Sequence, residues 1–81
     1  MKIRVLRGLV ENYTLADLKK AEDAIIHDLP TTFEVEGKNL SEKLNNIIAA
    51  INILEQMNAI HIEFEKALHD YAKTIKEPIL D

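Results

Sequence analysis

The hydrophobic positions of residues 3–13 fall on one side of a helical wheel. They are Ile3, Val5, Leu6, Leu9, Val10 and Tyr13. The charged residues of this stretch and Gly8 take the other side, which predicts a short amphipathic helix. Lys2-Ile3-Arg4-Val5 also alternates, so a strand over residues 2–6 is the competing interpretation. Gly8 weakens the helix by about 1 kcal/mol relative to alanine.

Residues 14–30 carry the signals of a second helix. Thr14 can cap the free N–H groups of the first turn, and Asp17 lies three residues later as in a capping box, a partial match because that position normally carries Glu or Gln. Apolar residues then recur at helical spacing, at Leu15, Leu18, Ala21, Ile25 and Leu29. Pro30 disfavours helical geometry at the residue before it, so we expect Pro30 to end this helix.

Between Thr31 and Gly37 the pattern changes to strict alternation. Phe33 and Val35 share one face, while the glutamates between and after them share the other. This alternation predicts a short extended segment. A lone strand leaves its backbone groups unpaired and needs a partner. The partner is either the same strand of another chain or the N-terminal segment, which would give an α+β fold with residues 2–6 paired to residues 32–36.

The longest predicted helix follows Asn39, the expected cap, with Glu42 three positions on. Its apolar positions are Leu40, Leu44, Ile47, Ile48, Ala50, Ile51, Ile53, Leu54 and Met57. They cover an arc of about 220°, against about 100° for an ordinary surface helix. Such a helix must be covered from two sides, which three short segments of one chain are not expected to do. We therefore predict a helical-bundle homodimer with this helix at its centre.

The long helix also supplies the candidate interface. Its expected subunit-core residues are Ile47, Ile51 and Leu54. Ile53 and Met57 are expected nearer the partner chain, so Ile53→Glu should dissociate the dimer. Asn46 interrupts the apolar arc, where it either fixes the register of a helix interface or is an exposed amide.

A last helix is predicted from an apolar face near the C-terminus. Its members are Phe64, Ala67, Leu68, Tyr71, Ala72 and Ile75. Ile62 points away from that face, so we expect a break near residues 58–62. No glycine or proline forces the break, and a single helix from Leu40 to Lys76 is the alternative. The fold class is thus mostly α, with three to four helices and one extended segment, in one domain over residues 1–81.

Composition narrows the possible functions. The chain has 81 residues and no cysteine, so disulfides and thiolate metal sites are excluded. Domains this small commonly need a metal or a partner chain for stability, which again favours an oligomer. The chain has ten basic and fourteen acidic residues. The basic residues at the N-terminus are too few for a phosphate-binding face, so we expect no nucleic-acid partner.

The distribution of apolar residues excludes a membrane partner. No apolar run approaches the roughly 18 to 20 residues that span a bilayer. The basic start resembles the head of a signal peptide, but Glu11 interrupts the apolar stretch that should follow. We therefore expect a cytoplasmic protein.

The best candidate for chemistry is the stripe His61, Glu65 and His69. Each residue follows the previous one by four, so on a continuous helix all three share one side. Imidazole and carboxylate together suit zinc or iron. The alternative is a solvated helix edge. The sequence contains no phosphate-binding glycine loop, and we expect no cofactor.

Three functions follow from these patterns. The first is a small helical module for oligomerisation or protein interaction, supported by the wide apolar arc. The second is a small ligand-binding or regulatory protein, with polar groups near Asn46, His61 or His69 at a dimer interface. The third is a metal-binding protein or enzyme that uses the histidine–glutamate stripe.

The chain also resembles a family of short, uncharacterised bacterial proteins. The resemblance covers most of the chain and rests on the ordered motifs Met1-Lys2-Ile3, Leu9-Val10-Glu11, Tyr13-Thr14-Leu15, Glu34-Val35-Glu36-Gly37 and Ile48-Ala49-Ala50-Ile51. Arg4 stands where the family has a proline, and residues 38–42 stand where it has a dense acidic run. The resemblance implies no known activity and no site residue.

Overall fold

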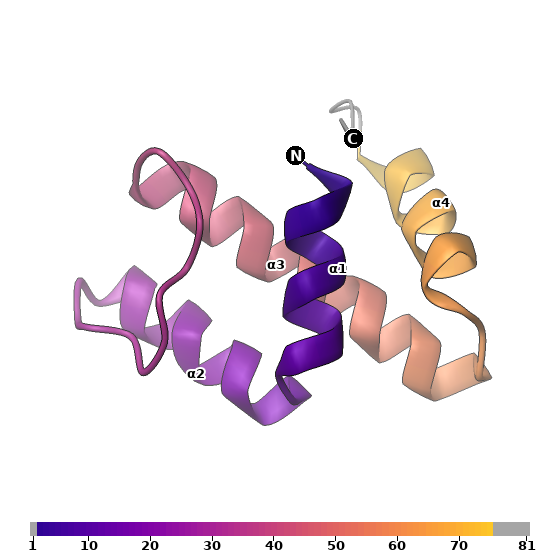
Figure 1. Ribbon diagram of the computed structural model, residues 1–81, viewed down its shortest axis with the longest axis horizontal. Coiled ribbons are helices and arrows are strands. Elements are labelled where there is room, and N and C mark those ends of the chain that lie inside the picture. Colours follow the sequence, from indigo (N-terminus) through magenta and orange to yellow (C-terminus); the bar gives the residue numbers. More distant parts are fainter. Residues whose placement is uncertain (1, 76–81) are drawn as a thin grey trace.

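The computed structural model describes residues 2–75, which form four helices and no β-strand (Figure 1). The helices are α1 (Ile3–Asn12), α2 (Leu15–Ile26), α3 (Leu40–Ile60) and α4 (Phe64–Thr74). The mostly α fold class is therefore confirmed. The α+β alternative is wrong, because residues 3–6 belong to α1.

Helix α3 is the centre of the molecule and contacts each of the other helices. Figure 1 shows α2 and α4 toward opposite ends of α3, with α1 crossing between them. The largest fully buried side chains are Leu6, Leu18, Ile47 and Ile53. The expectation that one chain cannot cover the apolar arc of α3 was wrong, because three helices of the same chain pack around it.

Local hydrogen bonds start α2 and α3 where the sequence predicts. The Asp17 N–H donates to Thr14 Oγ1 and the Thr14 N–H donates to Asp17 Oδ2, both at 3.1 Å, which completes the capping box. At α3 the Glu42 N–H donates to Asn39 Oδ1 at 2.9 Å. These bonds satisfy N–H groups that have no partner inside the helix.

Helix α2 ends at Ile26, before Pro30. Asp28 adopts a left-handed conformation with φ of 55°. The Leu29 N–H donates to Ala24 O at 2.7 Å and the Asp28 N–H donates to Ile25 O at 3.2 Å, which is a Schellman motif. The prediction that Pro30 sets the end of the helix was therefore wrong, and Leu29 lies outside α2.

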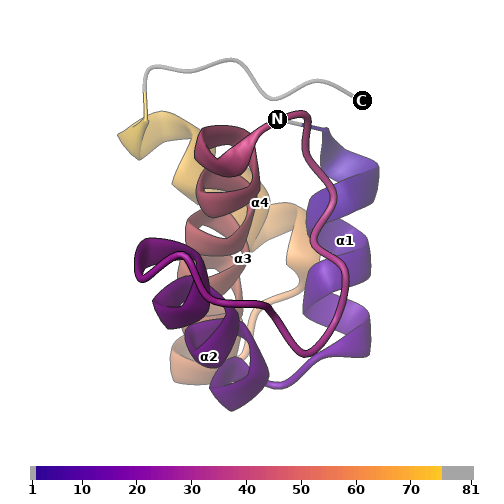
Figure 2. The ribbon, with the colours of Figure 1, turned by 90° about the vertical axis from the view of Figure 1, so that its left-hand side faces the viewer.

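Residues 27–39 connect α2 to α3 and pass beside α1 (Figure 2). Val35 is buried and Phe33 is half-buried, with its ring stacked on Tyr13 at a centroid distance of 3.8 Å. Glu34 and Glu36 are exposed, so the predicted alternation of burial is confirmed. The predicted pairing of this segment with the N-terminal residues is wrong, since residues 3–6 belong to α1 and no strand ladder forms within residues 2–75. Pairing with the same segment of another chain stays a prediction.

The predicted break before the last helix is confirmed. Helix α3 ends at Ile60, and His61 adopts the left-handed conformation with φ of 54° and ψ of 46°. Helix α4 begins at Phe64, so three residues turn the chain. The single helix from Leu40 to Lys76 is therefore not the arrangement in the folded chain.

Candidate interaction surface

The structure does not form the predicted metal stripe. His61 lies in the turn between α3 and α4, whereas Glu65 and His69 are exposed residues of α4. Within residues 2–75, no group of three or more histidine, aspartate or glutamate side chains is placed to hold a metal ion. The left-handed His61 interrupts the helix on which the predicted spacing depended, so the three residues do not share one helix face.

Glu65 is instead part of a contact between α1 and α4. The Arg7 guanidinium donates to Glu65 Oε1 at 2.9 Å and lies 4.7 Å from the centroid of the Phe64 ring. The hydrogen bond from Arg7 lowers the pKa of the Glu65 carboxyl below its ordinary value. Arg7 thus ties the start of α4 to α1.

The predicted interface residues lie deeper than the sequence indicated. Ile53 has no exposed surface in the single chain, and Met57 is half-buried. Ile53 therefore belongs to the subunit core and offers nothing for a partner chain to contact. Asn46 is 4% exposed, which excludes the exposed-amide alternative.

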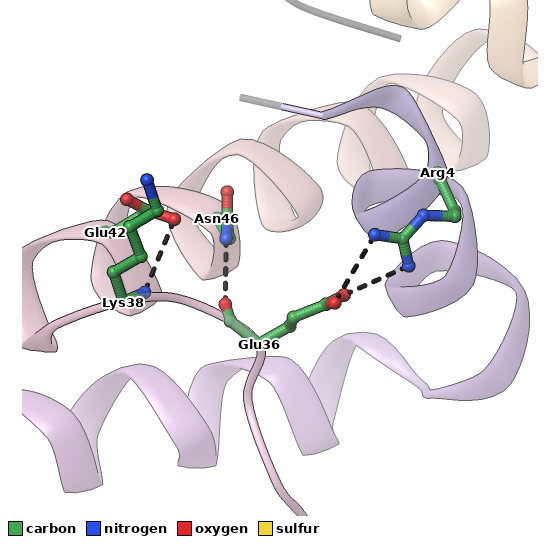
Figure 3. A network of polar contacts seen from close by, with 5 residues as sticks. All are labelled: Arg4, Glu36, Lys38, Glu42 and Asn46. Atoms are coloured by element: carbon green, nitrogen blue, oxygen red, sulfur yellow. Dashed lines mark hydrogen bonds and ion pairs between the residues drawn. The ribbon is translucent and has the colours of Figure 1, made fainter.

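Asn46 holds the connection between α2 and α3 to the core. Its Nδ2 donates to the backbone carbonyl of Glu36 at 2.9 Å, and Figure 3 shows Oδ1 pointing away from that bond. Oδ1 has no hydrogen-bond partner in the described part of the chain. On the outside, the Glu36 carboxylate meets the Arg4 guanidinium at 3.4 Å in an exposed pair, which contributes little to stability.

Among residues 2–75, four large apolar side chains are more than half exposed: Ile26, Leu29, Leu40 and Ile60. Leu29 and Leu40 line one hollow of about 210 Å³, with Ile25, Val35 and Pro30 also in its walls. The sequence patterns placed both leucines in apolar helix faces. Their places in the sequence could have indicated that both side chains are exposed. Leu29 directly precedes a proline, and Leu40 is the first residue of its helix.

Charged residues of both signs surround the two leucines. Asp28, Glu34 and Lys43 line the same hollow, and within residues 2–75 none of the three side chains has an ion-pair partner. We call Asp28, Leu29, Glu34, Leu40 and Lys43 together the Leu29–Leu40 surface. It combines exposed apolar area with unpaired charge.

A second hollow of about 180 Å³ lies between α3 and α4. Its lining residues are Asn52, Gln56, Ala67, Asp70, Tyr71 and Thr74. The Asp70 carboxylate is paired with Lys66 Nζ at 3.0 Å. Both hollows are smaller than the roughly 300 Å³ at which sites for small ligands begin. They suit single side chains of another protein better than a whole cofactor.

The fold and this surface define a small all-helical module. The family model for a family of unknown function, DUF6952, matches residues 1–79, so the chain belongs to that family. No curated protein and no solved structure matches the chain significantly. In addition, none of the helices in residues 2–75 has the length and apolarity needed to cross a membrane.

Proposed function

We propose that this protein is a small interaction module that acts in the cytoplasm as a homodimer formed through the Leu29–Leu40 surface. The observation that carries the proposal is the exposure of Leu29 and Leu40, at 58% and 54%, around one hollow. Burying apolar area of this kind stabilises an association by about 25 cal/mol per Å². The cytoplasmic location stays a prediction from the sequence.

The charges on this surface favour a second copy as its occupant. In a two-fold dimer the same patch meets itself, so it must be self-complementary. Asp28 and Glu34 are acidic, while Lys43 on α3 is basic. A two-fold arrangement can place each Lys43 against the acids of the partner, whereas a patch of one sign would repel its copy.

The first experiment measures the mass of the untagged protein by light scattering over low micromolar to millimolar concentrations. We expect a species of twice the 9.2 kDa chain mass. Leu40→Glu should raise the dissociation constant at least about tenfold, because it places a charge in an apolar contact. The matched control is Ile60→Glu, which makes the same change at a residue of similar exposure at the other end of α3.

Reversing the charges at positions 43 and 34 tests directly whether a second copy of the chain binds the Leu29–Leu40 surface. Lys43→Glu should weaken the dimer, since three acidic residues of each chain would then face the same three residues of the partner chain. Adding Glu34→Lys to the same chain should restore much of the affinity, because opposite signs again meet across the two-fold axis. A wild-type monomer at every concentration, or equal effects of Leu40→Glu and Ile60→Glu, would refute a dimer through this surface.

A further inference from the structure

The link between α3 and α4 is strained and yet compatible with a helix. His61 is a non-glycine residue in the left-handed region, with φ of 54°, a conformation that costs roughly 1–2 kcal/mol. The link His61-Ile62-Glu63 contains no glycine or proline, and neither do the residues on either side of it. Nothing in this sequence prevents α3 from continuing into α4.

We propose that this link is a hinge through which two copies of the chain exchange α4. In the exchanged form, His61 adopts helical geometry and residues 40–74 become one continuous helix. The α4 part of each chain then packs on α3 and α1 of the other. Short hinges under strain favour such domain swapping, which is a low-cost route to a dimer.

The exchange keeps the packing of α4. Phe64, Ala67 and Leu68 are buried in the single chain, and Arg7 contacts both Phe64 and Glu65. Each of these contacts can re-form between chains, because the partner presents identical surfaces. The balance between the two forms therefore depends on the strain at His61 and on protein concentration.

The length of the continuous helix requires a partner. Its 35 residues would extend about 52 Å at 1.5 Å per residue. The longest dimension of the molecule is 32 Å. A chain with the continuous helix cannot fold α4 back onto its own α3, so the buried face of α4 has to pack against a second chain.

The end of α2 provides a matched control within the same chain. Asp28 is also left-handed, with φ of 55°, but Pro30 follows two residues later. Proline cannot continue a helix, so relief of strain at Asp28 opens no route to a continuous α2–α3 helix. Glycine at either position removes the same strain, but only position 61 is a hinge.

The test compares His61→Gly, His61→Ala and Asp28→Gly in a Leu40→Glu background, where the Leu29–Leu40 surface is disabled. Each chain is unfolded, refolded at high concentration and separated by size. His61→Gly should lower the dimer association constant at least about tenfold, since it relieves the backbone strain of the folded-back form and destabilises the continuous helix. His61→Ala should raise it several-fold, and Asp28→Gly should leave it unchanged.

Spin labels then identify the form of the dimer. The chain has no cysteine, so Ser41→Cys and Lys73→Cys, both at exposed positions, label one chain specifically. Labelled chains are refolded with an excess of unlabelled chains. In a continuous helix the two positions lie about 48 Å apart. In the folded-back chain the two positions lie closer together, because α4 packs back against α3 in a molecule whose longest extent is 32 Å.

We expect the distance of about 48 Å between the labels at positions 41 and 73 in the dimer fraction alone. A dimer with only the short distance, equal dimer fractions in His61→Gly and His61→Ala, or no dimer at any concentration would overturn the exchange. The exchange and the Leu29–Leu40 dimer involve opposite ends of α3. Loss of association in Leu40→Glu therefore tests the proposed function, whereas the His61 variants test the hinge.

Discussion

At the scale of single residues, the two glycines of the chain differ in what a methyl group would meet. A Cβ at Gly37 would lie 2.8 Å from the backbone nitrogen of Lys43, whereas a Cβ at Gly8 would meet nothing closer than Asn12 Nδ2 at 4.0 Å. Gly37→Ala should therefore lower the free energy of unfolding by about 1–3 kcal/mol. Gly8→Ala should raise it by about 1 kcal/mol, because α1 loses a poor helix former. Urea denaturation followed by circular dichroism measures both, and the same sign for both variants would contradict this account.

Two carboxyl groups make the free energy of unfolding depend on pH. The Thr14 backbone N–H and hydroxyl lower the pKa of Asp17 below its ordinary value of 3.8, and Arg7 lowers the pKa of Glu65 below 4.5. The unfolded chain binds protons more readily at both groups. Their contribution is thus fully present above pH 4.5 and is lost as the pH falls through the folded-state pKa values.

We expect the urea midpoint of the wild type to decrease between pH 5 and pH 2. The decrease should be smaller for Asp17→Asn with Glu65→Gln, because neither position can then titrate. Denaturation curves at pH 5, 3.5 and 2 provide the measurement. An identical pH dependence in the wild type and the double variant would show that other groups govern acid stability.

At the scale of elements, one buried amide fixes the connection between α2 and α3. In the described part of the chain, Asn46 is the only buried polar residue, and its amide donates a hydrogen bond to the backbone carbonyl of Glu36. Asn46→Ala should lower the free energy of unfolding by about 1–2 kcal/mol and speed amide exchange in residues 33–38. Hydrogen exchange by NMR resolves that segment.

Asn52→Ala is the matched control for this prediction. The Asn52 amide donates to Ile48 O of its own helix at 2.8 Å and is exposed. Its removal should change stability by no more than about 0.5 kcal/mol. Slow exchange in residues 33–38 of Asn46→Ala would mean that Val35 and the Tyr13–Phe33 stack hold the connection without the amide.

At the scale of the whole molecule, α3 is covered by its own chain. Ile53→Glu is consequently expected to unfold the subunit rather than to dissociate a folded dimer, because a charge would enter a fully buried site. The loss should exceed about 4 kcal/mol. Met57→Glu, at a half-buried position, should leave the chain folded. Circular dichroism together with light scattering distinguishes the outcomes, and a folded monomer of Ile53→Glu would restore Ile53 to the interface.

Local signals in the amino-acid sequence define the helices and most of their limits. The Thr14–Asp17 capping box and the cap at Asn39 each depend on groups within a few positions of one another. Periodicity and capping bonds are local, so the amino-acid order specifies them before the chain packs. The Schellman end of α2 was missed because its signal, a left-handed Asp28 in place of glycine, is weak in sequence.

Which apolar residues stay exposed to a partner depends instead on how the helices pack together. The contacts that cover α3 join distant parts of the chain. The Arg7–Glu65 pair is separated by 58 residues and the Arg4–Glu36 pair by 32. A helical wheel shows that α3 is apolar over a wide arc, but it cannot show that α1, α2 and α4 occupy the arc while Leu29 and Leu40 stay exposed. Burial follows from how whole elements pack, and the local pattern that forms each helix does not encode that packing.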